Sequence, residues 1–285
     1  MVKPAGGDNA EQIDFWNGEA GKRWADEQDS LDAMLHPLGL GAIERADLMA
    51  GDRVIDVGCG CGVSTLAIAH IVGPTGHVLG VDVSEPMLQV AKQRGKGHGN
   101  LSFTRADAST YKFAPATADL IFSQFGVMFF SDPQAAFKNI RKALKPDGRV
   151  CMVVWRPAKE NPWVMRCLKI AAEHGPLPAP MGPDAPGPFA FGDVEKVEGI
   201  LEGAGFSDVH MEPQDMKMHI GAGRDLNGAV DFLLGIGPMR MLLEEHEPKL
   251  REKIRAQIVA ALTPDFTPQG LLMDSATWIV TAKNG

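Results

Sequence analysis

Short apolar runs rich in β-branched residues alternate with segments of helical periodicity between residues 52 and 155. The runs predict buried strands over 53–58, 77–84, 101–108, 118–126 and 149–155. The intervening segments predict helices over 63–73, 85–95 and 133–148. Strands that alternate with helices and are apolar on both faces indicate an α/β fold, with a parallel sheet covered on both sides.

The pattern changes before and after this unit. Residues 11–50 have apolar positions at helical spacing and predict two or three helices. Residues 156–192 are rich in proline, with one expected helix beginning at Asn161-Pro162. The rest predicts a helix over 193–206, a strand over 207–219, helices over 225–263 with a break near Pro248, and a final strand over 275–284.

The charge of the chain bears on its possible partners. The 285 residues carry a formal net charge of −8, which argues against a nucleic-acid-binding scaffold. The first residues lack the apolar core of a signal peptide, and no apolar run approaches the roughly 18 residues of a membrane span. We therefore expect no membrane span and a cytoplasmic location. Four cysteines do not form a disulfide framework.

A glycine-rich turn follows the first expected strand, in the stretch "VIDVGCGCGVSTLA" at 54–67. Gly58, Gly60 and Gly62 can turn the chain tightly and let a ligand approach backbone N–H groups at the start of the next helix. The dinucleotide fingerprint requires a glycine where this chain has Val63. The turn therefore predicts a nucleotide-like ligand and disfavours a nicotinamide cofactor.

Acidic residues follow the next strands. Asp82 ends the second strand, where a carboxylate can accept hydrogen bonds from both ribose hydroxyls. Asp107 ends the third and can receive an adenine amino group, and Asp56 can lie near an ammonium group or brace the turn. These carboxylates favour a ligand with a positive centre and no phosphates.

Cys59 and Cys61 lie within the turn without a nearby histidine or second cysteine pair. This spacing is not that of a zinc site, so we expect no metal and interpret both cysteines as small residues in a crowded turn.

The stretches "VIDVGCGCGVSTLAIA", "GVDVSEPML", "FTRADA", "DLIFSQFGVMFF" and "NIRKALKPDGRVCMVVW" occur in this order. Together they resemble the successive motifs of class I S-adenosylmethionine-dependent methyltransferases. The resemblance is strongest to the small-molecule branch that includes ubiquinone/menaquinone C-methyltransferases. It covers residues 50–156 closely and 193–283 in outline.

The resemblance implies a fold and a set of cofactor contacts. The fold is a Rossmann-like, doubly wound, seven-stranded and mostly parallel sheet with the last strand antiparallel, plus a helical cap. The backbone of the turn would hold the methionine part of the cofactor, and Asp82 would hold its ribose. The residues implied at the cofactor are Asp56, Gly58, Cys59, Gly60, Gly62, Asp82, Val83, Met87, Asp107, Ala108, Ser123, Gln124, Phe125, Trp24 and Gln28.

We expect four parts in the chain. Residues 1–50 form an N-terminal helical cap over the cofactor, and 51–156 form the S-adenosylmethionine-binding core. Residues 157–192 form a proline-rich lid segment. Residues 193–285 complete the core and carry a helical insert at 220–270 that covers the substrate.

Several residues are candidates for an acceptor pocket. Trp155, Arg156, Asn161 and Trp163 follow the fifth strand, where open α/β sheets place ligands, although they can equally anchor a loop. Trp16 lies in the N-terminal helices, which fold over the cofactor in related enzymes. His36 and Met239 complete the set, the latter in a methionine-rich stretch that can line an apolar cavity.

The function predicted is transfer of a methyl group to a small, hydrophobic or aromatic acceptor, yielding S-adenosylhomocysteine. A non-catalytic S-adenosylmethionine-binding partner or regulator is the alternative, and a nicotinamide-dependent oxidoreductase is a weaker one. The sequence identifies no catalytic base, which leaves C-, O- and N-methylation open. It does not indicate an oligomeric state.

Overall fold

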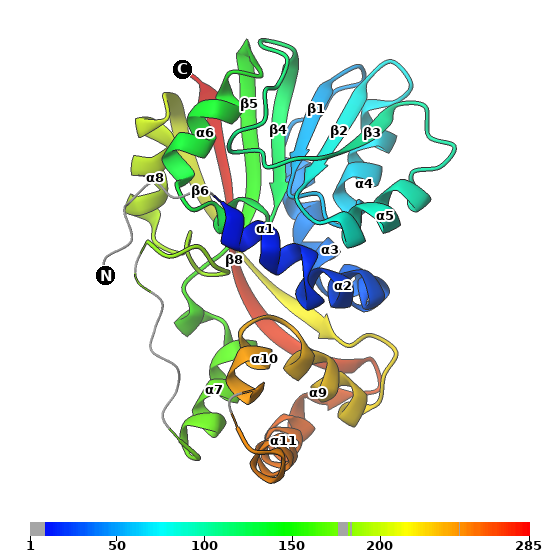
Figure 1. The fold of residues 1–285 in the computed structure, drawn as a ribbon, viewed down its shortest axis with the longest axis vertical. Helices are drawn as coiled ribbons and strands as arrows, with labels where there is room; N and C mark the ends of the chain where they lie inside the picture. The colour runs from blue at the N-terminus through cyan, green and yellow to red at the C-terminus, as the bar shows by residue number, and fades with distance from the viewer. Residues whose placement is uncertain (1–8, 176–181, 183, 245) are drawn as a thin grey trace.

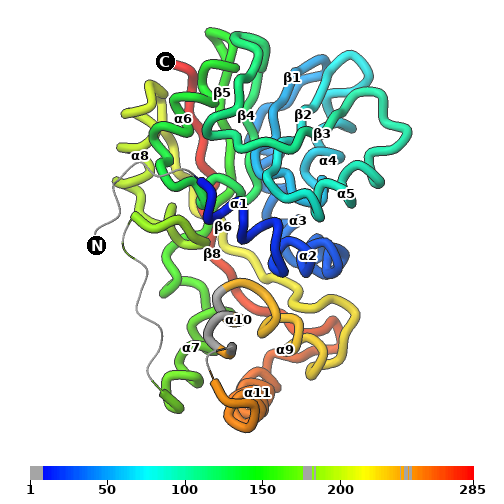
Figure 2. Tube along the Cα trace, viewed as in Figure 1, coloured from blue at the N-terminus to red at the C-terminus, as the bar shows by residue number. Residues whose placement is uncertain are grey.

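A computed structural model of the chain describes residues 9–175, 182, 184–244 and 246–285. A sheet with helices on both sides forms the upper part of the molecule, and a helical lobe forms the lower part (Figure 1). Two long strands, β6 (Phe206–Ile220) and β8 (Gly270–Asn284), run from the sheet into the lobe (Figure 2). The two parts are therefore joined by continuous antiparallel pairing.

The sheet has the order β3-β2-β1-β4-β5-β8-β6. Its first five strands are parallel to one another, and β8 is antiparallel to both of its neighbours. This confirms the predicted fold class. A two-residue strand, β7 (Phe266–Thr267), also pairs with β8, and it is too short to have a sequence pattern. The parallel strands are β1 (Arg53–Val57), β2 (His77–Asp82), β3 (Leu101–Arg105), β4 (Ala118–Gln124) and β5 (Leu144–Trp155).

Crossover helices cover both faces of the sheet. The chain moves across the sheet from β1 to β2 and β3 in one direction, and from β4 to β5 in the opposite direction. Because such crossovers are right-handed, α4 and α5 lie on one face of the sheet and α6 lies on the other. Ser84, Asp132 and Asp193 cap α5, α6 and α8 with their side chains. The bounds are α4 (Val63–Val72), α5 (Glu85–Arg94), α6 (Pro133–Arg141) and α8 (Val194–Gly203).

The helix predicted to reach residue 148 ends earlier, at Arg141, and β5 begins at Leu144. Leu144 pairs with Ala118, whereas Arg149 pairs with Leu120, so β5 has extra residues in the ladder. The Pro-Asp-Gly sequence therefore forms an irregularity within the strand rather than the end of the helix, which the helical spacing before it did not reveal.

The N-terminal segment forms three helices, α1 (Ala10–Asn17), α2 (Glu19–Asp26) and α3 (Gln28–Arg45). Helix α3 packs on β5, β6 and β8 and buries Leu31, Met34, Leu35, Leu38 and Ile43. It is thus a sheet-covering helix as well as part of the predicted cap.

Helix α1 is fastened to the loop after β2. The Asn17 side chain donates to the Val83 carbonyl (3.0 Å) and accepts from the Glu85 N–H (3.1 Å). The Ser84 hydroxyl donates to the Trp16 carbonyl (2.7 Å). These contacts hold α1 over the carboxyl edge of the sheet, where it crosses the front of the molecule in Figure 1.

The lower lobe contains α7 (Pro162–Ala172), α9 (Leu226–Gly235), α10 (Gly237–Glu244) and α11 (Pro248–Leu262). Phe232, Leu233, Ile254, Ile258 and Leu262 form its apolar interior. The predicted break near Pro248 is present, and a second one occurs at Ile236. Short 3-10 turns are η1 (Val127–Phe129), η2 (Ala158–Glu160) and η3 (Thr263–Asp265).

Candidate functional site

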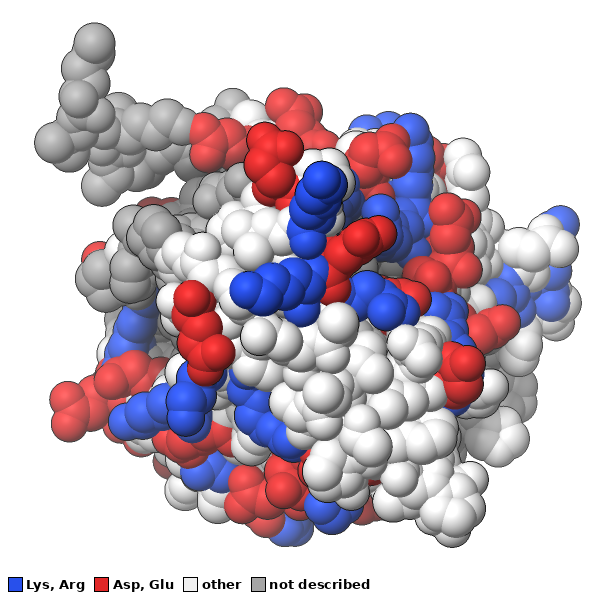
Figure 3. Space-filling view, turned by 90° about the horizontal axis from the view of Figure 1, so that it is seen from below, with Lys and Arg blue, Asp and Glu red and all other residues white. Residues whose placement is uncertain are grey.

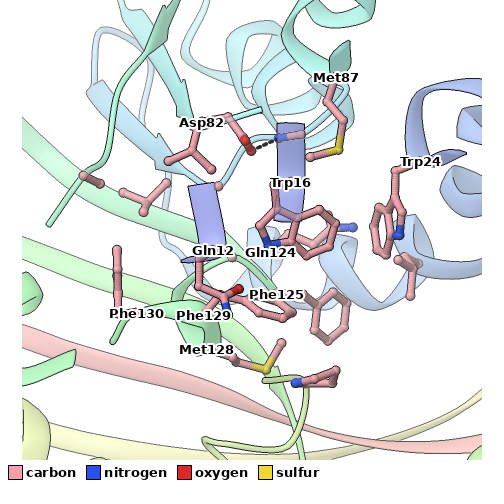
Figure 4. A pocket seen from close by; sticks show the side chains of 18 of the residues that line it. Gln12, Trp16, Trp24, Asp82, Met87, Gln124, Phe125, Met128, Phe129 and Phe130 are labelled. Atoms are coloured by element: carbon pink, nitrogen blue, oxygen red, sulfur yellow. Dashed lines mark hydrogen bonds between the residues drawn. The ribbon is translucent and has the colours of Figure 1, made fainter. Parts of the chain in front are cut away.

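A cavity of about 1130 Å³, including its open mouth, lies at the carboxyl edge of the parallel strands. Such an edge is where open α/β sheets bind ligands, because the loops after neighbouring strands meet there. Figure 4 shows Asp82 and Met87 at one end and Met128 and Phe129 toward the other, with Trp16 of α1 between them. The cavity therefore has a polar end above the sheet and an apolar end toward the lobe.

Asp82 forms the polar end. One carboxylate oxygen accepts from the Gly60 N–H (2.8 Å), and the other accepts from the Ser84 N–H (2.8 Å). Burial raises the pKa of Asp82, and these backbone donors oppose that shift. The backbone N–H groups of Gly60, Val83 and Ser84 use at most three of the roughly four acceptor positions of a carboxylate, so Asp82 keeps acceptor capacity for a ligand.

Asp107 lies nearby on the loop after β3, with Val83, Met87 and Ala108 also lining this end. Its Oδ1 accepts from the Ser109 N–H (2.9 Å) and from the Asn9 amide (3.3 Å). The structure thus brings both predicted nucleoside acids to one end of one cavity.

The glycine turn passes beneath the cavity. Gly58 has φ +70°, and a Cβ added there would lie 2.6 Å from the Gly126 Cα. Gly60 also lines the cavity. Gly62 instead packs on Ala91 and Phe103 and lines neither this cavity nor its neighbour. The turn therefore requires glycine for a close backbone approach at Gly58 and for helix packing at Gly62.

Gln124 ends β4, and Phe125 follows it at the centre of the site. The Gln124 Oε1 is buried and has no partner among the described residues. A side chain at Gly39 of α3 would overlap it, so glycine there makes room for the amide. Phe125 has φ +61° and stacks on Trp155 with ring centroids 4.6 Å apart. An orphaned acceptor and a strained aromatic residue are features that functional sites commonly retain.

A smaller cavity of about 490 Å³ adjoins the first. The two share seven lining residues, which are Trp24, Leu31, Leu35, Gly58, Gly60, Gln124 and Phe125. The smaller one is completed by Gln28, Asp32, Cys59, Cys61, Val63 and Ser64. The shared lining shows that the two cavities are direct neighbours.

The apolar end combines residues of α3, the sheet edge, the segment after β5 and the lobe. Phe129 contacts Trp16 edge to face, with ring centroids 5.2 Å apart, and Trp155 packs against Trp163. Its walls are Leu31, Met34, Leu35, Met128, Phe129, Phe130, Trp155, Trp163, Pro188, Ile236 and Gly237. These surfaces favour an aromatic or aliphatic ligand.

Several predicted residues line neither cavity. Asn161 is a buried anchor whose amide both donates to and accepts from the Ala276 backbone, and it also holds the Trp163 indole N–H. The Arg156 guanidinium pairs with Asp215 and lies over the Trp278 ring. The anchoring interpretation therefore applies to both. The others outside the cavities are Asp56, Gly62, Ser123, His36 and Met239.

The remaining predicted residues outside the cavities are partly or fully buried in the fold. Ser123 donates to the Val57 carbonyl (2.8 Å) and accepts from the Gly126 N–H, which shapes the turn after β4. His36 is half-buried, and burial lowers its pKa, so the ring is neutral near pH 7. Met239 is part of the lobe interior.

Asp56 braces the first turn of α4. Its Oδ2 accepts from the Ser64 and Thr65 hydroxyls at 2.7 and 2.6 Å, while its Oδ1 has no partner among the described residues. Burial raises the pKa of Asp56 to about 6. This position supports the bracing interpretation.

The raised pKa predicts a pH-dependent effect of Asp56→Asn. Because the folded-state value lies above the unfolded one of about 3.9, the contribution of Asp56 to stability is present at low pH and is lost as the pH rises through about 6. From about pH 4.5 to about pH 8, we expect the variant to gain about 2 kcal/mol relative to the wild type. Urea unfolding of both proteins at the two pH values measures this, and a constant difference would contradict it.

The sequence did not identify many of the lining residues. Asn9 and Gln12 of α1 have no distinguishing motif, and Pro188 and Ile236 come from segments whose placement depends on tertiary structure. Two signals were available: the apolar stretch "VMFF" at 127–130 comes soon after β4, and Leu31 and Leu35 share a helical face with Gln28.

Both cysteines of the turn are protonated thiols. Burial raises the pKa of Cys61 to about 12 and that of Cys59 well above its ordinary value. Among the described residues, no three His, Cys, Asp or Glu side chains are grouped as a metal site.

The fold and the site define a Rossmann-like α/β protein with a cavity at the sheet edge that has two carboxylates at one end. Comparison with known families matches residues 54–148 to the methyltransferase domain. Demethylmenaquinone methyltransferase of Staphylococcus saprophyticus is 30% identical over 177 residues, which are 59% of this chain and 75% of the relative. The chain belongs to the class I S-adenosylmethionine-dependent methyltransferases, and S-adenosylmethionine is its cofactor.

A further relative and a solved structure are also similar to this chain. Nocamycin O-methyltransferase of Saccharothrix syringae is 26% identical over 80% of this chain and 83% of the relative. The structure of Haemonchus contortus phosphoethanolamine N-methyltransferase 2, solved with phosphomonomethylethanolamine and S-adenosylhomocysteine, has a TM-score of 0.54 and 19% identity. It covers 87% of this chain and 53% of that chain, and the likeness supports the fold.

Proposed function

We propose that the chain transfers the methyl group of S-adenosylmethionine to a small, hydrophobic or aromatic acceptor bound at the apolar end of the larger cavity. The observation that carries the proposal is the continuity of that cavity. It runs from the Asp82 and Asp107 carboxylates to walls of aromatic and aliphatic side chains. A cofactor and an acceptor can therefore meet inside one enclosed space.

The chemistry of the polar end fits the cofactor. Asp82 would accept the ribose hydroxyls, Asp107 the adenine amino group, and Val83 and Met87 would flank the base. The unpartnered Gln124 Oε1 and the rings of Phe125 and Trp24 line the centre, where electron-rich groups favour a cation. When bound, S-adenosylmethionine supplies an electrophilic methyl group on a positively charged sulfur.

The apolar walls distinguish between acceptor chemistries. The names of the relatives point to a demethylmenaquinone, a phosphoethanolamine and a nocamycin acceptor. A phosphate needs charged or strong hydrogen-bond donors, whereas Trp155, Trp163 and Ile236 present carbon surfaces. This lining supports the first and third kinds of acceptor over the second.

The contribution of the chain to the reaction is mainly positioning. Holding a nucleophile in line with the methyl group inside an apolar pocket lowers the entropic barrier and keeps water away. The polar side chains toward the acceptor are the amides of Gln12 and Gln124, which orient an acceptor through hydrogen bonds.

Turnover in an acceptor panel tests the function. We expect formation of S-adenosylhomocysteine with methyl-labelled product when the protein meets phenolic, quinol or enolic apolar acceptors, and little product with phosphorylated amines. Binding of the cofactor without turnover across the panel would favour the alternative, a non-catalytic partner or regulator.

A bulky residue at the apolar end tests whether the acceptor and the cofactor bind at different ends of the cavity. Ile236→Trp is expected to fill the space beside Gly237, because Ile236 is a buried wall residue of the lobe. We expect turnover to fall at least about tenfold, while affinity for S-adenosylhomocysteine stays within about twofold. Initial rates measure the turnover and calorimetry measures the affinity, with Ile236→Val as the mild control. Equal losses of both would place the acceptor elsewhere.

The surface supports a small-molecule acceptor over nucleic acid. Figure 3 shows acidic and basic side chains interspersed on the face seen from below, rather than one basic field. No helix among the described residues is long and apolar enough to cross a membrane. The cytoplasmic location and the division into cap, core, lid and insert stay predictions.

A further inference from the structure

The smaller cavity contains a carboxylate that the contacts proposed above leave unassigned. Gln28, Leu31, Asp32 and Leu35 are spaced three or four residues apart on α3, so they share one helical face. That face lines the smaller cavity together with Gly58, Cys59, Gly60 and Cys61 of the glycine turn. The sequence identified Gln28 but not Asp32.

The Asp32 side chain is held by two donors that use the same oxygen. Its Oδ2 accepts from the Gln28 amide (2.8 Å) and pairs with the Arg94 guanidinium (2.9 Å). Arg94 is fixed in turn by donating to the Cys61 carbonyl (3.0 Å). Within the described residues no hydrogen bond involves Oδ1, so one carboxylate oxygen is available to a donor in the cavity.

The first turn of α4 adds the complementary polarity to the lining of this cavity. Val63 and Ser64 line the cavity at the first turn of α4, where backbone N–H groups favour an anion. A space lined by both a helix N-terminus and a carboxylate suits a group with both charges. An α-amino acid end carries an ammonium and a carboxylate at neutral pH.

Asp56, the other acid near the turn, does not meet this requirement. It is fully buried, is engaged by the Ser64 and Thr65 hydroxyls, and lines neither cavity. Asp82 belongs to the nucleoside end of the larger cavity. Asp32 is thus the carboxylate that lines the smaller cavity.

We propose that Asp32 binds the α-ammonium group of the methionine moiety of the cofactor, with Arg94 and Gln28 as positioning residues that orient the carboxylate. The inference rests on the proposed function, which places the nucleoside at Asp82. It gives α3 a specificity role: the chain selects a cofactor with an intact amino-acid end.

Changing Asp32 and removing the α-amino group of the ligand, separately and together, tests whether the two groups interact. Calorimetry compares wild type and Asp32→Asn with S-adenosylhomocysteine, with its analogue lacking the α-amino group, and with 5′-methylthioadenosine. For the variant, we expect about a tenfold or larger loss of affinity for S-adenosylhomocysteine. Affinity for the other two ligands is expected to change less than about threefold. Asp32→Glu should restore part of the loss, since it keeps the charge.

The controls distinguish the possible failures. Asp26→Asn changes an exposed acid at the end of α2 and should leave all three affinities unchanged. Retained binding of 5′-methylthioadenosine shows that Asp32→Asn is folded. A loss shared equally by the three ligands, or no loss with S-adenosylhomocysteine, would overturn the role of Asp32. If wild type bound none of the ligands, the proposed function itself would be wrong.

Discussion

Asp82→Ala is expected to weaken binding of S-adenosylhomocysteine by about 100-fold or more. Two charge-assisted hydrogen bonds to ribose hydroxyls would be lost, and together they contribute about 3 kcal/mol. The change also removes the acceptor for the Gly60 and Ser84 N–H groups, so the turn below the ligand loses its support. Isothermal titration calorimetry of both proteins with S-adenosylhomocysteine measures the loss.

A matched carboxylate at the other end of the sheet provides the control. Asp119 also accepts a backbone bond, from the Arg53 N–H (2.8 Å), and pairs with Lys145. Asp119→Asn is expected to lower stability while leaving the affinity unchanged. An Asp82→Ala protein that binds S-adenosylhomocysteine as tightly as the wild type would remove the nucleoside from this end of the cavity.

Gly58→Ala is expected to abolish detectable cofactor binding and to destabilise the fold by about 3 kcal/mol or more. A positive φ alone costs an alanine about 1–2 kcal/mol. In addition, the new Cβ would meet the Gly126 Cα at 2.6 Å, so the turns after β1 and β4 must separate. Urea unfolding and calorimetry with S-adenosylhomocysteine measure the two effects.

Gly97→Ala measures the effect of a positive φ on stability without the steric clash that occurs at Gly58. Gly97 has φ +88°, but an added Cβ has no atom within 4 Å. We expect a stability loss of about 1–2 kcal/mol and unchanged affinity. If Gly58→Ala behaved in the same way as Gly97→Ala, the close approach of the two turns would have no part in binding.

The sheet was predictable because its signals are local. Buried strands of β-branched residues, glycine at a turn with positive φ and side-chain caps such as Ser84 each leave a mark within a few residues. The bulge that begins β5 was missed, because Pro146-Asp147-Gly148 is equally typical of a helix end. The pairing partner, rather than the local sequence, determines that outcome.

The polar and the apolar end of the larger cavity also differ in how far the local sequence predicts them. Asp82 and Asp107 follow strands of a known topology, so their meeting at one edge could be inferred from the strand order. The apolar end requires α1, η1, Pro188 and the break at Ile236 to converge on one space. No local pattern encodes that convergence. Asn161 was predicted for the pocket because it lies near the strand edge, but its side chain instead anchors the backbone of Ala276.

A structure of the protein crystallised with S-adenosylhomocysteine tests the central claim most directly. We predict the ribose hydroxyls within hydrogen-bond distance of the Asp82 carboxylate, and the sulfur beside Gln124 and Phe125. The amino-acid end would lie in the smaller cavity, and the aromatic end of the larger cavity would remain open to an acceptor. A ligand bound outside these two cavities, or reversed within them so that adenine meets Trp163, would contradict the account.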